Sequence, residues 1–149
     1  MNNKLSLFLA LGTSLIAHQS LAFETTVKST CESQLLVSSY DHDNVKIYNG
    51  CNGAYIRDID DEGLIAGAQA IIELDDDTIV IASEKNNRLV AYDKGNLDNG
   101  RIVIDRGTNG FVTTPLGLAL DANNDLLVAS YSENKVIKVD INSWQVKET

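Results

Sequence analysis

The chain has 149 residues and a formal net charge of −9 at pH 7, from 12 basic and 21 acidic side chains. This length suits one domain of ordinary size. A net negative surface repels the phosphates of nucleic acids and of anionic membranes, and no cluster of lysine or arginine interrupts it. The composition therefore excludes nucleic acid as a partner, and solubility is the simplest role for the charge.

The first 22 residues predict a secretory signal peptide. Residues 1–4 carry a lysine, residues 5–17 are apolar, and 20–22 read Ser-Leu-Ala, a cleavage site of the small-x-small kind. The apolar run is shorter than the roughly 20 residues that a membrane-spanning helix needs. We expect cleavage after Ala22, a periplasmic or secreted mature chain that begins at Phe23, and no membrane contact once the leader is removed.

Three units of similar pattern follow, at about 31–60, 66–106 and 114–149. Each contains short β-rich runs divided by clusters of Asn, Asp and Ser, which is typical of a strand meander. Residues 93–100 are expected to form a turn-rich connection, and 67–72 is expected to be a strand although its alanines also tolerate helix. The expected strands are 34–40, 44–49 and 53–58 in the first unit, 68–74, 78–83, 87–92 and 100–105 in the second, and 116–120, 126–131, 135–140 and 144–148 in the third.

The three units align as a repeat. Ser39, Ser83 and Ser130 occupy the same place, at steps of 44 and 47 residues. Such a period, with several strands per unit, indicates β-propeller blades, while a non-repetitive β-sandwich is the alternative. The apolar runs 79–82 and 126–129 predict strands that neighbouring blades cover on both faces. The expected fold is all-β: an incomplete propeller of about three four-stranded antiparallel blades, the first without its inner strand.

The third unit resembles an NHL-type blade. The resemblance is carried by PLGLALD at 115–121, NDLLVAS at 124–130 and NKVIKV at 134–139. It is similar also to blades of the six-bladed, TolB-like group that includes gluconolactonase-like proteins. The second unit matches in part, because Gln69 and Ile71 stand where the motif has proline and glycine. The resemblance to gluconolactonase-like proteins implies a divalent metal in the central channel, but no residue of this chain can be matched to the ligands of that metal.

A closed propeller needs at least four blades, and three units are too few for one. We therefore expect either further C-terminal blades or a homo-oligomer in which copies of the chain complete each other. Cys31 and Cys51 flank the first hairpin and are expected to form a disulfide in an exported protein, the alternative being two free thiols. Neither cysteine has the spacing of a zinc site.

The loops between the second and third strands of the blades are the candidate ligand-binding site. In the first loop, a histidine between two aspartates could act as a general base or ligand, although the equivalent positions in the other units are ordinary turn residues. In a propeller these loops gather on one face together with the segments 59–67 and 106–114. The candidate binding residues are Asp41, His42, Asp43, Glu84, Lys85, Ser132 and Glu133.

Residues 121–125, Asp-Ala-Asn-Asn-Asp, have the spacing that opens a calcium loop, but lack its glycine and its final glutamate, so a tight turn is expected. No nucleophile motif or phosphate-binding glycine loop is present in the sequence. The sequence predicts an exported scaffold that binds a protein, a sugar or a small molecule, with no cofactor and no catalytic residue assigned. The alternatives are a fragment of a metal-dependent hydrolase or lactonase, in which a divalent metal would act, and a calcium- or quinone-dependent sugar dehydrogenase.

Overall fold

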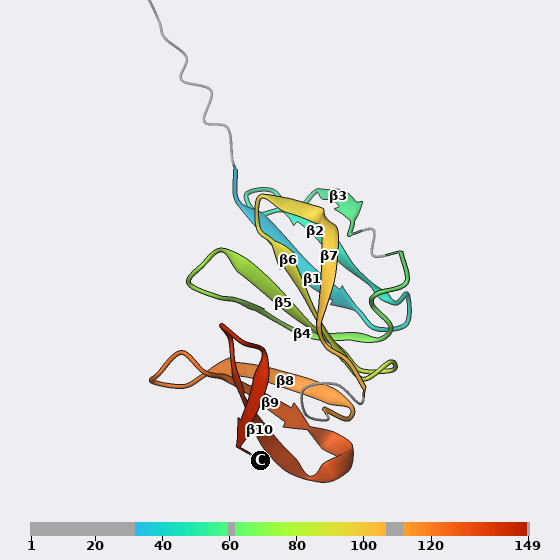
Figure 1. The fold of residues 1–149 in the computed structure, drawn as a ribbon. Helices are drawn as coiled ribbons and strands as arrows, with labels where there is room; N and C mark the ends of the chain where they lie inside the picture. The colour runs from blue at the N-terminus through green and yellow to red at the C-terminus, as the bar shows by residue number, and fades with distance from the viewer. Residues whose placement is uncertain (1–31, 60–61, 107–111, 149) are drawn as a thin grey trace, which may run out of the picture. The chain divides into compact units, whose positions relative to one another are not determined.

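The computed structural model describes residues 32–59, 62–106 and 112–148, which form three antiparallel sheets of three, four and four strands (Figure 1). In every sheet, strands that follow each other in sequence are hydrogen-bonded neighbours, so each sheet is a meander. The all-β architecture expected from the sequence is confirmed. The first sheet contains β1 (Gln34–Ser39), β2 (Asn44–Asn49) and β3 (Tyr55–Asp58); the second contains β4 (Ala68–Glu73), β5 (Thr78–Ser83), β6 (Arg88–Asp93) and β7 (Asn96–Ile104); the third contains β8 (Pro115–Leu120), β9 (Leu126–Ser130), the short 3-10 helix η1 (Tyr131–Glu133), β10 (Lys135–Asp140) and β11 (Gln145–Glu148).

The outer strand of the second sheet differs from the expectation. β7 begins at Asn96 rather than near residue 100, and Asp93 pairs with Asn96, so the connection is a two-residue turn at Lys94 and Gly95. The polar composition of 93–100 suggested a longer loop. Leu97, which is buried against the core between the first two sheets, explains why the strand starts early.

The turns between first and second strands are fixed by acidic or amide residues with positive φ. Asp77 and Asn124 have φ values of 61° and 60° at equivalent places in the second and third sheets. Asn and Asp accept this left-handed conformation more readily than other side chains. The tight turn expected at 121–125 is confirmed, because the N–H of Asn124 donates to the carbonyl of Asp121 at 3.1 Å.

Two apolar clusters hold neighbouring sheets together. One cluster joins Val45 and Ile47 of β2 to Ile79 and Ile81 of β5, and the other joins the second sheet to the third. Every residue of β5 is buried, as the prediction of a doubly covered strand requires. In β9 only alternate residues are fully buried, so the same prediction is wrong for one face of the third sheet among the described residues.

Some sequence predictions lie outside the described residues, namely the leader with its cleavage at Ala22, the start at Phe23, and Cys31. The disulfide between Cys31 and Cys51 therefore stays a prediction. Within 32–59, 62–106 and 112–148, no helix has the length and apolar character needed to cross a membrane.

Candidate functional site

The loops that join β1 to β2, β5 to β6 and β9 to β10 occupy the same position in their sheets, and we call this set the loop end. Each loop closes as a turn at an Asx residue, Asp43, Asn87 or Asn134, with φ between 53° and 60°. The backbone N–H of this residue donates to the carbonyl three residues earlier, at 3.1 Å in the second loop and 3.2 Å in the third. The repeated geometry explains why an Asx residue recurs at this place in the repeat.

In the first loop, Asp43 joins the first sheet to the second. Its Oδ1 accepts a hydrogen bond from the Gly67 N–H at 2.8 Å and from Lys85 Nζ at 2.8 Å. Lys85 Nζ also donates to the carbonyl of Tyr40 at 3.0 Å and lies 4.5 Å from the centre of its ring. The hydrogen bond from Lys85, and then that from Gly67, lowers the pKa of Asp43, and the same contact raises the pKa of Lys85.

Glycine is required at position 67 by this contact. Its φ is +68°, and a Cβ there would lie 2.8 Å from Cγ of Lys85 and 2.9 Å from Cε2 of Tyr40. A Cβ at this place would therefore displace the Lys85 and Tyr40 side chains, and the positive φ itself favours glycine. The sequence therefore fixes a tight inter-sheet junction at this place.

The second loop makes the same kind of bond to the third sheet. Asn87 Oδ1 accepts the Thr114 N–H at 2.8 Å, and Thr114 has a positive φ, as Gly67 does. Thr114 Oγ1 lies 2.6 Å from Oγ of Ser132. Glu133 accepts from Thr113 Oγ1 at 2.5 Å and pairs with a lysine, and these contacts lower its pKa, the lysine being the larger cause.

Two of the three serines that mark the repeat, Ser83 and Ser130, hold the chain as it enters the second and third sheets. The buried Ser83 Oγ accepts the N–H of Ala66 at 2.7 Å and donates to the carbonyl of the same residue at 3.2 Å. Ser130 repeats this with Thr113, at 3.2 and 2.7 Å. A hydroxyl can donate and accept at once, which an ionised carboxylate cannot do, and this explains serine at this place of the second and third sheets.

The structure brings some of the predicted binding residues together and leaves others apart. Asp43 and Lys85 form one ion pair, whereas Glu84 accepts from Nε2 of Gln69 at 2.5 Å. Asp41 and His42 are exposed, and His42 Nδ1 lies 3.1 Å from Ser39 Oγ within its own turn. Sequence reasoning missed Tyr40, Thr113 and Thr114, for which the available signal was their fixed offset from the aligned serines.

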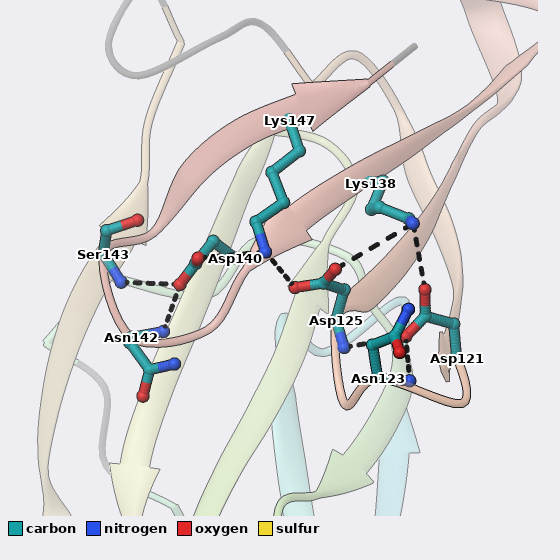
Figure 2. A network of polar contacts seen from close by, with 8 residues as sticks. All are labelled: Asp121, Asn123, Asp125, Lys138, Asp140, Asn142, Ser143 and Lys147. Atoms are coloured by element: carbon teal, nitrogen blue, oxygen red, sulfur yellow. Dashed lines mark hydrogen bonds and ion pairs between the residues drawn. The ribbon is translucent and has the colours of Figure 1, made fainter.

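A second polar network lies at the opposite ends of these strands in the third sheet (Figure 2). Asp125, which is 8% exposed, receives Lys147 Nζ at 2.7 Å and lies 3.9 Å from Lys138 Nζ. Lys138 also contacts Asp121 at 3.1 Å, and Lys147 contacts Asp140 at 3.0 Å. The Nζ of Lys138 thus lies between Asp121 and Asp125, the two carboxylates whose spacing is that of a calcium loop.

This polar network links the strands and turns of the third sheet to one another. Asp140 accepts the N–H groups of Asn142 and Ser143 at 2.8 and 3.1 Å, which forms the turn between β10 and β11. The hydrogen bond from Lys147, followed by these two backbone bonds, lowers the pKa of Asp140 to about 2. Among the residues that the structure describes, no group of three or more His, Cys, Asp or Glu side chains is arranged to hold a metal ion.

A hollow of about 540 Å³ lies between the first and second sheets, away from the loop end. Its polar lining includes Glu32 and the ion pair between Glu73 and Lys94, while Leu36 and Ile79 form its apolar side. It lies beside β1, which pairs with β2 on one edge and with no strand on the other edge among the described residues.

Comparison with known proteins bears on the fold. No family model matches the chain, and no curated protein matches it. The extracellular domain of a hybrid two-component system from B. thetaiotaomicron has a similar structure, with a TM-score of 0.61 at 16% sequence identity. The match covers 78% of this chain and 17% of that protein's chain. At this identity the likeness concerns the arrangement of the strands.

Proposed function

We propose that the chain is an exported, non-catalytic segment of a β-propeller of NHL-like type, in which the three sheets are successive blades. Its role is that of a scaffold that binds a protein, a sugar or a small molecule at the loop end. The three consecutive meanders support the architecture, and the likeness to an extracellular domain agrees with export. Fold alone does not decide the function, so the proposal depends on the site.

One observation carries the proposal: the charged and polar side chains of the loop end are used to join neighbouring sheets. Asp43 with Lys85 connects the first two sheets, and Asn87 connects the second to the third. A nucleophile or general base needs a side chain that reaches a substrate, whereas these side chains are held on backbone groups. They form a rigid edge that presents the residues around them.

Those surrounding residues suit recognition. Tyr131 is 68% exposed at the start of η1, and Tyr40 and His42 are exposed in the first loop. Tyrosine offers a large apolar face and a hydroxyl, a combination that is enriched at binding surfaces. A partner that packs against these rings would gain contact area with little loss of side-chain entropy.

Binding can be tested by ligand-observed NMR against a panel of soluble monosaccharides and oligosaccharides. Tyr131→Ala should abolish the signal of any ligand found, and Tyr55→Ala is the matched control, because Tyr55 is 55% exposed in β3, away from the loop end. A ligand lost equally in both variants would contradict a loop-end site.

The hydrolase alternative is tested by metal analysis of the purified chain together with a screen of ester and lactone hydrolysis. Activity that disappears with a chelator and returns with one divalent cation would overturn the non-catalytic proposal. Export is tested separately by the mass of the protein recovered outside the cytoplasm, which should correspond to a chain that begins at Phe23.

A further inference from the structure

The three sheets use the same two faces to pack on one another. The strand pairs share one register: Leu36 lies opposite Ile47 in the first sheet, Val80 opposite Ala91 in the second and Leu127 opposite Lys138 in the third. Each sheet therefore has a forward face, which turns toward the following sheet, and a backward face, which turns toward the preceding one. The forward face of the second sheet contains Val80, Ala82, Leu89 and Ala91, and it packs on the backward face of the third, which contains Leu126, Val128, Ile137 and Val139.

The forward face of the third sheet is equivalent to the forward face of the second, but among the described residues no sheet packs on it. Val136 is 55% exposed, whereas Leu89 in the equivalent place is 0% exposed. A shallow hollow of about 280 Å³ lies beside Val136 on this face. Besides Val136 it is lined by Gly117, Leu118, Ala119, Leu127 and Ala129.

The backward face of the first sheet likewise has no other sheet on it among the described residues. Leu35 is 54% exposed, whereas Ile79 in the equivalent place of the second sheet is 3% exposed. Val37 is 38% exposed, and its equivalent Ile81 is 0% exposed. Within the part of the chain that the structure describes, each half of an interface made twice internally is thus also present once without a sheet on it.

The hydrogen bonds that the Asx residues accept from the next sheet also distinguish the third sheet from the first two. Asp43 and Asn87 each accept a backbone N–H from the entry to the following sheet, both at 2.8 Å. Asn134, the third member, has the same left-handed backbone with φ 53° and lies exposed, and its amide makes no such bond within 32–59, 62–106 and 112–148. Asn134 thus has the same backbone conformation as the two residues that accept these inter-sheet hydrogen bonds.

We infer that the forward face of the third sheet binds the backward face of the first sheet in a second copy of this chain. The contact is head-to-tail, so each copy uses a different face and both copies keep one face for a further contact. The internal interfaces supply the argument for this occupant, because the first sheet offers Leu35 and Val37 at the places where the third sheet offers Leu126 and Val128 to the second. A lysine takes one apolar place on each open face, Lys46 on the first sheet and Lys138 on the third. This inference does not depend on what the loop end binds.

The test is the mass of the purified chain in solution, measured by analytical ultracentrifugation over a wide dilution series. The wild-type chain should associate as its concentration rises. Val136→Asp and Leu35→Asp should each weaken association by at least about tenfold, because a buried carboxylate without a partner costs more than 1.4 kcal/mol. Both side chains are more than half exposed in the single chain, so circular dichroism should show an unchanged fold.

Mixing the two variants identifies the geometry. Val136→Asp keeps a good backward face and Leu35→Asp keeps a good forward face, so the mixture should form a one-to-one complex although each variant alone is monomeric. Ile102→Asp is the matched control, because Ile102 is 38% exposed on the outer strand of the second sheet and should leave association unchanged. A wild-type chain that stays monomeric, a mixture that does not associate, or a control that dissociates would each overturn the inference.

Discussion

Val45 in the first sheet and Val136 in the third occupy equivalent places, and replacing each of them by alanine tests whether burial between sheets stabilises this fold. Val45 is 0% exposed in the cluster between the first two sheets, whereas Val136 is 55% exposed. Val45→Ala removes two methylene equivalents from the core, about 1.6 kcal/mol at ~0.8 kcal/mol each, and a cavity term raises the loss to about 2–3 kcal/mol. Val136→Ala should cost less than about 1 kcal/mol, because roughly half of that side chain is already in water.

The assay is urea unfolding of dilute protein, followed by the fluorescence of Trp144 and by circular dichroism. With a slope near 2 kcal/mol per molar urea, Val45→Ala should lower the midpoint by about 1 M or more and Val136→Ala by less than about 0.5 M. The two changes have the same intrinsic effect on strand propensity, so their difference reports packing. Equal losses would refute the reasoning, because they would show that the contact between sheets adds nothing to stability.

Three further predictions follow. The free energy of unfolding should fall as the pH drops from about 4 to about 2. Asp140 has a native pKa of about 2 and a usual value of 3.8, so the unfolded chain binds more protons than the folded chain in this range. Urea midpoints that do not change between these pH values would contradict the prediction. Asn87→Gly should cost about 1 kcal/mol in thermal unfolding by removing an inter-sheet hydrogen bond, and Asn134→Gly, which has the same left-handed backbone, should leave the dilute chain's stability closer to wild type. If Cys51 pairs with Cys31, the oxidised mature chain should take up no thiol label, and Cys51→Ser should lower the free energy of unfolding by roughly 3 kcal/mol. Labelling of two thiols in the folded chain would exclude the disulfide.

The sequence was sufficient for the strands and their repeat because both depend on local patterns. Apolar runs of four to six residues, divided by Asn and Asp, predict strand positions without knowledge of the tertiary structure. The aligned serines at 39, 83 and 130 then predicted which residues are equivalent. β7 was placed too late because its first residues are polar, and only the burial of Leu97 between two sheets reveals the strand.

The roles of the loop residues could not be predicted in the same way. Asp43 and Lys85 were both expected to bind a ligand, but they bind each other across 42 residues of sequence. A turn aspartate that is exposed to water and one that holds the next sheet have the same local pattern. Likewise, the apolar run of β9 resembles that of β5, although a following sheet covers only β5 among the described residues.

The two open faces differ from the buried ones in a way that explains how they coexist with water. At the place of Val90 and Ile137 the first sheet has Lys46, and at the place of Ile47 and Ala91 the third sheet has Lys138. Each of these lysines pairs with an aspartate of its own sheet, at 3.1 Å in both cases. A lysine lays its methylene stem over apolar surface and keeps its charge at the rim, which discourages indiscriminate sheet contacts. These two lysines lie on the open faces and not on the two internal interfaces, so they make the open faces compatible with water, while the apolar residues beside them keep the pattern of a surface that binds another sheet.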